Sequence, residues 1–97
     1  MTKPTVVIDA RGVTDEMDFW KRYVSATEPD GAGLFGHNLD AFWDAVEGGG
    51  PGYPGKVDLH FKNMASLRSL PNGQKFMKEF AEIAALSKFT KITWDYS

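Results

Sequence analysis

Residues 34–54, LFGHNLDAFWDAVEGGGPGYP, contain the start, the body and the end of one helix. Asn38 is a good N-cap residue because its side-chain oxygen can accept a hydrogen bond from a backbone N–H of the first turn. Four apolar residues follow at the spacing of one buried helix face: Leu39, Phe42, Trp43 and Val46. Residues 48–55 include five glycines, which end the helix and form a loop. The sequence therefore predicts a helix from Leu39 to about Glu47.

The same helix carries a stripe of carboxylates beside its apolar face. Its members, at i, i+4 and i+7, are Asp40, Asp44 and Glu47. Asp40 suits the positive N-terminal end of the helix dipole, but Asp44 and Glu47 lie near the negative end, where no base accompanies them in the sequence. We interpret these acids as serving a basic partner. The alternative is a solvated acidic face without a function.

The rest of the chain contains three segments typical of β-strands and three further helical segments. The predicted strands are residues 5–8, 56–61 and 90–94. The predicted helices are residues 15–26, 63–70 and 74–86. This order, β-α-α-β-α-α-β, favours an α/β fold in which helices pack on a three-stranded parallel sheet. A chain of 97 residues supports one hydrophobic core, so we expect a single domain over residues 1–97.

Several local features follow from the same patterns. Thr14 is the expected N-cap of the first helix, and Met17, Trp20 and Val24 recur at i, i+3 and i+7 as its expected buried stripe. The first strand is rich in β-branched residues and is expected to be buried on both faces. Gly36 is expected to provide a turn with positive φ before the second helix.

Composition narrows the class of protein. There is no cysteine, which removes disulfides, thiolate nucleophiles and cysteine-based zinc sites. The N-terminal sequence MTKPTVVID has only three apolar residues before an acid, too few for a signal peptide, and no run approaches the roughly 20 apolar residues of a membrane span. We therefore expect a cytoplasmic protein without a membrane partner.

The net charge of −2 is unevenly distributed along the chain. Residues 23–55 contain five acids and no Lys or Arg, whereas the rest contains eight acids and eleven bases, so the formal charges are −5 and +3. An acidic patch on a nearly neutral protein favours a basic partner and argues against nucleic acid binding there.

Residues 34–44, with the glycines and Tyr53-Pro54 that follow, resemble the signature of barstar-type ribonuclease inhibitors. The pattern Gly-x-Asn-Leu-Asp-Ala-aromatic-Trp-Asp is fairly specific, and the predicted order of elements matches this family over nearly the whole chain. The resemblance implies an intracellular protein inhibitor, not an enzyme, that inserts its second helix and the preceding loop into the active site of a small ribonuclease. It further implies a 1:1 complex, a monomer when free, and no cofactor.

The resemblance also implies which residues bind the partner. In the family, the aspartate that matches Asp44 takes the place of a substrate phosphate among the cationic groups of the enzyme, and the one that matches Asp40 supports it. Other positions that match the family's inhibitory face are Phe35, Gly36, Asn38, Trp43, Gly48 and, at its periphery, Glu82. Leu34 and Gly49 stand where the family has aromatic residues, which leaves the identity of the target open. Leu34 is still expected to contact the partner, and Glu47 is added from the acidic stripe. The expected partner-binding residues are therefore Leu34, Phe35, Gly36, Asn38, Asp40, Trp43, Asp44, Glu47, Gly48 and Glu82.

Other interpretations of the same residues remain open. One is a barstar-like module that binds a basic partner other than a nuclease. His37 with Asp40 and Asp44 is a possible metal site, and the two aspartates are possible acid/base groups, but no nucleophile or phosphate-binding motif accompanies them. His60 is expected to be a surface histidine with Asp58 as the only acid near it.

Overall fold

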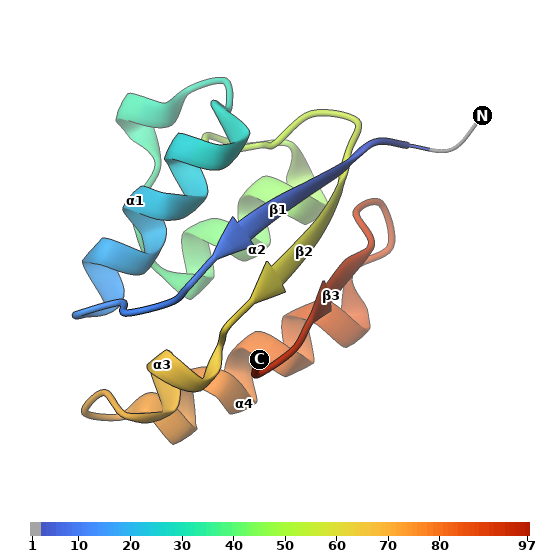
Figure 1. Ribbon diagram of the computed structural model, residues 1–97. Helices are drawn as coiled ribbons and strands as arrows, with labels where there is room; N and C mark the ends of the chain where they lie inside the picture. The colour runs from blue at the N-terminus through green and yellow to red at the C-terminus, as the bar shows by residue number, and fades with distance from the viewer. Residues whose placement is uncertain (1–2) are drawn as a thin grey trace.

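A computed structural model describes residues 3–97 of the chain. The strands are β1 (Thr5–Asp9), β2 (Asp58–Lys62) and β3 (Ile92–Trp94). The helices are α1 (Glu16–Thr27), α2 (Leu39–Gly48), α3 (Ala65–Arg68) and α4 (Gly73–Leu86), with a short 3-10 turn, η1 (Ala32–Leu34), before α2 (Figure 1). The order of strands and helices confirms the predicted α/β arrangement. Within these residues no helix is both long enough and apolar enough to cross a membrane.

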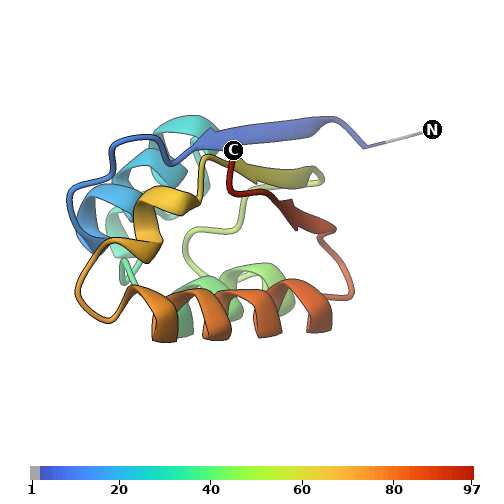
Figure 2. The ribbon, with the colours of Figure 1, turned by 60° about the horizontal axis from the view of Figure 1, so that its bottom comes forward.

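The three strands form a parallel sheet in which β2 lies between β1 and β3. Leu59 in β2 pairs with Val6 on one side and Ile92 on the other. The helices gather on one side of this sheet (Figure 2). Ile8, on the helix side of β1, is fully buried, whereas Val7 on the opposite side is 48% exposed. The prediction that the first strand is buried on both faces is therefore wrong, because helices cover only one face and β1 is an edge strand.

The N-terminus of α1 is capped one residue later than predicted. Asp15, not Thr14, is the N-cap, and its Oδ1 accepts a hydrogen bond from the backbone N–H of Asp18 at 2.7 Å. In return, Oδ2 of Asp18 accepts the backbone N–H of Thr14 at 3.1 Å, and this hydrogen bond lowers the pKa of Asp18. Such reciprocal bonds satisfy backbone donors that the helix itself leaves free.

The buried face of α1 also differs from the predicted one. Phe19, Trp20 and Tyr23 are fully buried, whereas Met17 is 49% exposed and Val24 is only partly buried. Aromatic side chains bury more apolar area than Met or Val, so the helix is rotated to place its rings in the core. Only Trp20 of the predicted stripe lies at the centre of the buried face.

The core is an aromatic cluster that joins the helices to the sheet. The ring of Phe42 in α2 lies 5.2 Å from Trp20, 5.3 Å from Tyr23, 6.1 Å from Phe61 and 6.2 Å from Phe80, centroid to centroid. Aromatic pairs at such distances are each worth about 0.5–1.5 kcal/mol beyond their burial. Phe42 therefore fixes α2 against α1, β2 and α4 together.

The glycine-rich loop after α2 is held against the segment before α2. Tyr23 donates its hydroxyl to the carbonyl oxygen of Gly52 at 2.7 Å, and burial raises the pKa of Tyr23. The backbone N–H of Gly52 donates to the carbonyl oxygen of Asp30 at 3.0 Å. Gly52 has φ of +93°, and a Cβ at this position would overlap the ring of Phe35. The two segments that flank α2 are thus fixed to each other and to α1.

The close approach of Gly52 to Phe35 predicts a large effect of adding one methyl group. The substitution Gly52→Ala is expected to lower the free energy of unfolding by about 2–5 kcal/mol, because it combines steric overlap with an unfavourable positive φ. Urea denaturation measures this loss. Gly55→Ala is the matched control, since Gly55 has φ of +90° but no atom within 4 Å of its added Cβ, and about 1–2 kcal/mol is expected there. Equal losses in the two variants would contradict the steric role of Phe35.

Candidate functional site

The side chain of Asn38 fixes the start of α2. Its Oδ1 accepts the backbone N–H of Ala41 at 2.7 Å, which confirms the predicted N-cap, and its Nδ2 donates to the carbonyl oxygen of Gly36 at 3.1 Å. At the other end, Gly49 is the C-cap with φ of +69°. Both ends of α2 are therefore set by local sequence, and Asn38 also ties the helix to the loop before it.

In the loop before α2, His37 has the left-handed backbone conformation that was predicted for Gly36. His37 has φ of +54°, and its Nδ1 lies 2.8 Å from the carbonyl oxygen of Phe35. The prediction that Gly36 provides a positive φ is wrong, since Gly36 is outside that region. Gly36 is instead favoured by space, because a Cβ there would lie only 3.1 Å from the Cβ of Ala41. The tight contact brings the loop close to the first turn of α2.

The two large apolar residues of this loop lie in opposite environments. Leu34 is 80% exposed, so its side chain is available to a partner. Phe35 is 4% exposed, with its ring centroid 5.7 Å from that of Trp20 and 5.5 Å from that of Tyr23. The side chain of Phe35 belongs to the core and supports the loop from within.

Two of the three acids expected on α2 project into solvent. Asp40 and Asp44 are exposed. Glu47 is half-buried, and its Oε1 accepts the backbone N–H of Lys88 at 2.8 Å. Glu47 therefore connects α2 to the segment after α4, while Gly48, the last residue of α2, is exposed.

A groove of about 310 Å³ lies between α2 and α4, which run side by side (Figure 2). Its apolar lining consists of Leu39, Trp43, Ile83 and Leu86. The carboxylates that border it are Asp40, Asp44, Glu79 and Glu82. The structure thus brings the predicted Glu82 to the same groove as the aspartates of α2. Sequence reasoning missed Glu79, although its spacing from Glu82, Ile83 and Leu86 on one helix was an available signal.

No base within residues 3–97 forms an ion pair with the four carboxylates of this groove. The acids that do form ion pairs in this part of the chain lie elsewhere: Asp9, Asp18, Asp58 and Asp95. Four acids around one concave surface, with no base among the described residues that line it, give this surface a negative potential that attracts cationic groups. The groove can therefore bind basic side chains with charge-assisted hydrogen bonds.

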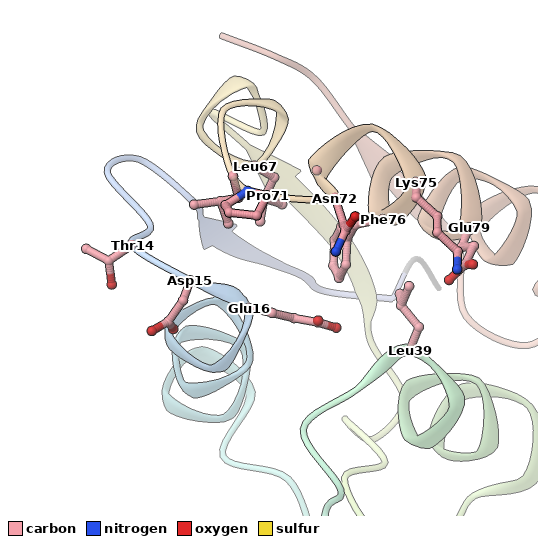
Figure 3. A pocket seen from close by; sticks show the side chains of 12 residues that line it. Thr14, Asp15, Glu16, Leu39, Leu67, Pro71, Asn72, Lys75, Phe76 and Glu79 are labelled. Carbon is pink, nitrogen blue, oxygen red and sulfur yellow. The ribbon is translucent and has the colours of Figure 1, made fainter.

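A second hollow, of about 470 Å³, adjoins the groove at Leu39 and Glu79, which line both (Figure 3). Its other acids already have partners within the chain: Asp15 caps α1, and Oε1 of Glu16 accepts the indole N–H of Trp20 at 3.3 Å. Lys75 also contributes a positive charge to its lining. Because its charges are mixed and partly engaged, this hollow attracts cations less strongly than the groove.

The two histidines lie apart from the groove. On the sheet, Nε2 of His60 lies 3.0 Å from Oδ2 of Asp95, and its Nδ1 lies 2.8 Å from Oγ1 of Thr93. The expectation that Asp58 is the only acid near His60 is wrong, because the β2–β3 register places Thr93 beside His60 and Asp95 follows two residues later. In the part of the chain that the structure describes, no three His, Asp or Glu side chains are grouped so that they could hold a metal ion.

Residues 3–93 match the sequence model of a family described as Barstar (barnase inhibitor). No curated protein matches the chain. The family match covers both helices that build the groove, and it extends over all three strands except the last residue of β3. Because this match spans nearly all of its 97 residues, the chain belongs to the barstar (barnase inhibitor) family.

Proposed function

We propose that this chain is an intracellular protein inhibitor of a small ribonuclease and that it blocks the active site of the enzyme with the acidic face of α2. The observation that carries this proposal is the groove between α2 and α4, where four carboxylates meet without a basic partner from the described residues. Membership of a family of inhibitors supports a binding function and not a catalytic one.

The chemistry of a ribonuclease explains why carboxylates suit this task. Such an enzyme must gather cationic donors to stabilise the charge that develops on a transferring phosphoryl group. A carboxylate can occupy the same donors with charge-assisted hydrogen bonds. Asp44 and Asp40 are exposed on a rigid helix, so they are already positioned to do this.

The proposed binding residues fall into two groups according to their environment. Those that offer an exposed or partly exposed side chain or backbone to the enzyme are Leu34, Gly36, Asp40, Trp43, Asp44, Gly48 and Glu82, together with Glu79. Phe35, Asn38 and Glu47 are engaged within the chain, through the core, the N-cap and the bond to Lys88, respectively. We assign to these three the role of holding the face in shape. One enzyme bound at this acidic groove makes a 1:1 complex, which is the stoichiometry we propose.

A basic partner other than a nuclease would use the same face, so mutation alone does not separate the two functions. Inhibition of RNA cleavage does separate them, because only an active-site blocker stops the reaction. Titration of the protein into a panel of small basic bacterial ribonucleases, barnase included, is therefore the first experiment. If no enzyme is inhibited at micromolar concentration, the partner is not a nuclease of this class.

The substitution Asp44→Ala is expected to raise the inhibition constant for the inhibited enzyme at least about 30-fold, which corresponds to about 2 kcal/mol. The physical reason is that cationic groups of the enzyme are then buried without a partner. Titrations of RNA cleavage measure the change. Asp95→Asn is the control, since Asp95 lies beside His60 on the sheet and away from the groove. A similar loss in both variants would show that the effect is not specific to the acidic face.

Association with the enzyme is expected to slow at least tenfold when the salt concentration rises from about 50 to 500 mM, because salt screens the attraction between the acidic groove and a basic partner. Stopped-flow fluorescence of the tryptophans follows this rate. A double variant, Asp40→Asn with Asp44→Asn, is expected to depend less on salt, since two of the four groove charges are removed. A salt dependence equal to that of the unmodified protein would refute electrostatic steering by these two residues.

A further inference from the structure

We propose that Leu86 is a specificity-determining contact, which packs against an apolar side chain that the target enzyme carries beside its cationic active site. This inference rests on the proposed function, because it specifies what the same face recognises next to the charged groups. Nothing in the charge pattern of the groove requires a leucine at this place.

Leu86 occupies an unusual environment for a large aliphatic residue. It is the last residue of α4, it is 62% exposed, and it lines the groove together with Trp43 and Ile83. Isolated exposed leucines are common on protein surfaces and require no explanation by themselves. Leu86 differs in its location, since it extends the apolar lining of an acidic groove out to the protein surface.

The end of the groove at Leu86 has charges of both signs around it. The carboxylate of Glu47 accepts the backbone N–H of Lys88, so the negative charge of Glu47 is held beside this segment. Lys88 itself is exposed and adds a base two residues after Leu86. The exposed base weakens the attraction of a cationic group to this end of the groove, and the exposed side chain of Leu86 is complementary to an apolar group of the partner.

Three hydrogen bonds fix the chain around Leu86. The backbone N–H of Ser87 donates to the carbonyl oxygen of Ile83 at 2.9 Å, and its hydroxyl donates to that of Thr90 at 2.8 Å. The third is the bond from Lys88 to Glu47. A side chain held on a rigid support costs less entropy to bind, so Leu86 is prepared for contact before the enzyme arrives.

Specificity needs a contact of this kind. The cationic groups of a ribonuclease active site are required by its chemistry, so the acidic residues of an inhibitor meet similar groups in every such enzyme. Discrimination between enzymes must come from the surface around the active site. Apolar contacts of an interface also act mainly on the dissociation rate, whereas exposed charges act on association.

The test compares Leu86→Ser with two matched variants, using barnase and a panel of other small basic bacterial ribonucleases. Leu86→Met keeps an apolar side chain, and Phe89→Ser removes an equally exposed residue, also 62%, that lies outside the groove. Leu86 is exposed, so all variants are expected to fold, which circular dichroism verifies. Inhibition constants, dissociation rates and their salt dependence are measured for the enzyme that the unmodified protein inhibits most strongly.

Leu86→Ser is expected to raise the inhibition constant about tenfold, or about 1.4 kcal/mol, through faster dissociation and without a change in salt dependence. Leu86→Met and Phe89→Ser are expected to stay within twofold of the unmodified protein. An unchanged inhibition constant for Leu86→Ser, while Asp44→Ala still loses inhibition, would overturn this inference alone. If the unmodified protein inhibits no enzyme of the panel, the proposed function fails and the inference fails with it.

Discussion

The packing of Phe42 among four aromatic rings determines how α2 is rotated about its own axis. Rings from α1, β2 and α4 surround it, so a rotation of α2 would separate Phe42 from several elements at once. Because residues of one helix project at fixed angles, burial of Phe42 sends Asp40 and Asp44 outward. The direction of the carboxylates is therefore a consequence of core packing, and their own hydrogen bonds play no part in it.

Features of the fold that depend on neighbouring residues were predictable from the sequence, and those that depend on distant residues were not. Asn38 caps α2 as its position suggested, since an N-cap needs only the following turn. The buried face of α1 was predicted wrongly because Met17 and Val24 are apolar too, and the choice between them and Phe19 or Tyr23 is made by rings from other elements. The contact of His60 with Asp95 likewise depends on strand order, which the sequence does not encode locally.

The candidate site shows the same division. Asp40 and Asp44 were predicted from helical spacing, and Glu82 only from the family resemblance. The helical spacing of Glu79 from Glu82 was visible in the sequence, but only the packing of α4 beside α2, a long-range arrangement, brings Glu79 to the aspartates of α2. Glu47 fits the acidic stripe in sequence, yet its partner is a backbone N–H 41 residues away, so its carboxylate holds two segments together. The spacing in the sequence identified which acids share a side of the helix. Tertiary contacts decided which of their carboxylates accept hydrogen bonds within the chain and which are exposed to solvent.

The negative charge of the groove also affects how the protein interacts with RNA in the same solution. The carboxylates of Asp40, Asp44, Glu79 and Glu82 repel the phosphates of an RNA strand, which disfavours binding of RNA in the groove. An enzyme that cleaves RNA gathers cationic groups in its active site, so the proposed target has the opposite charge to this surface. Under the proposed function, the sign of the charge at this groove would therefore separate the enzyme from the enzyme's own substrate.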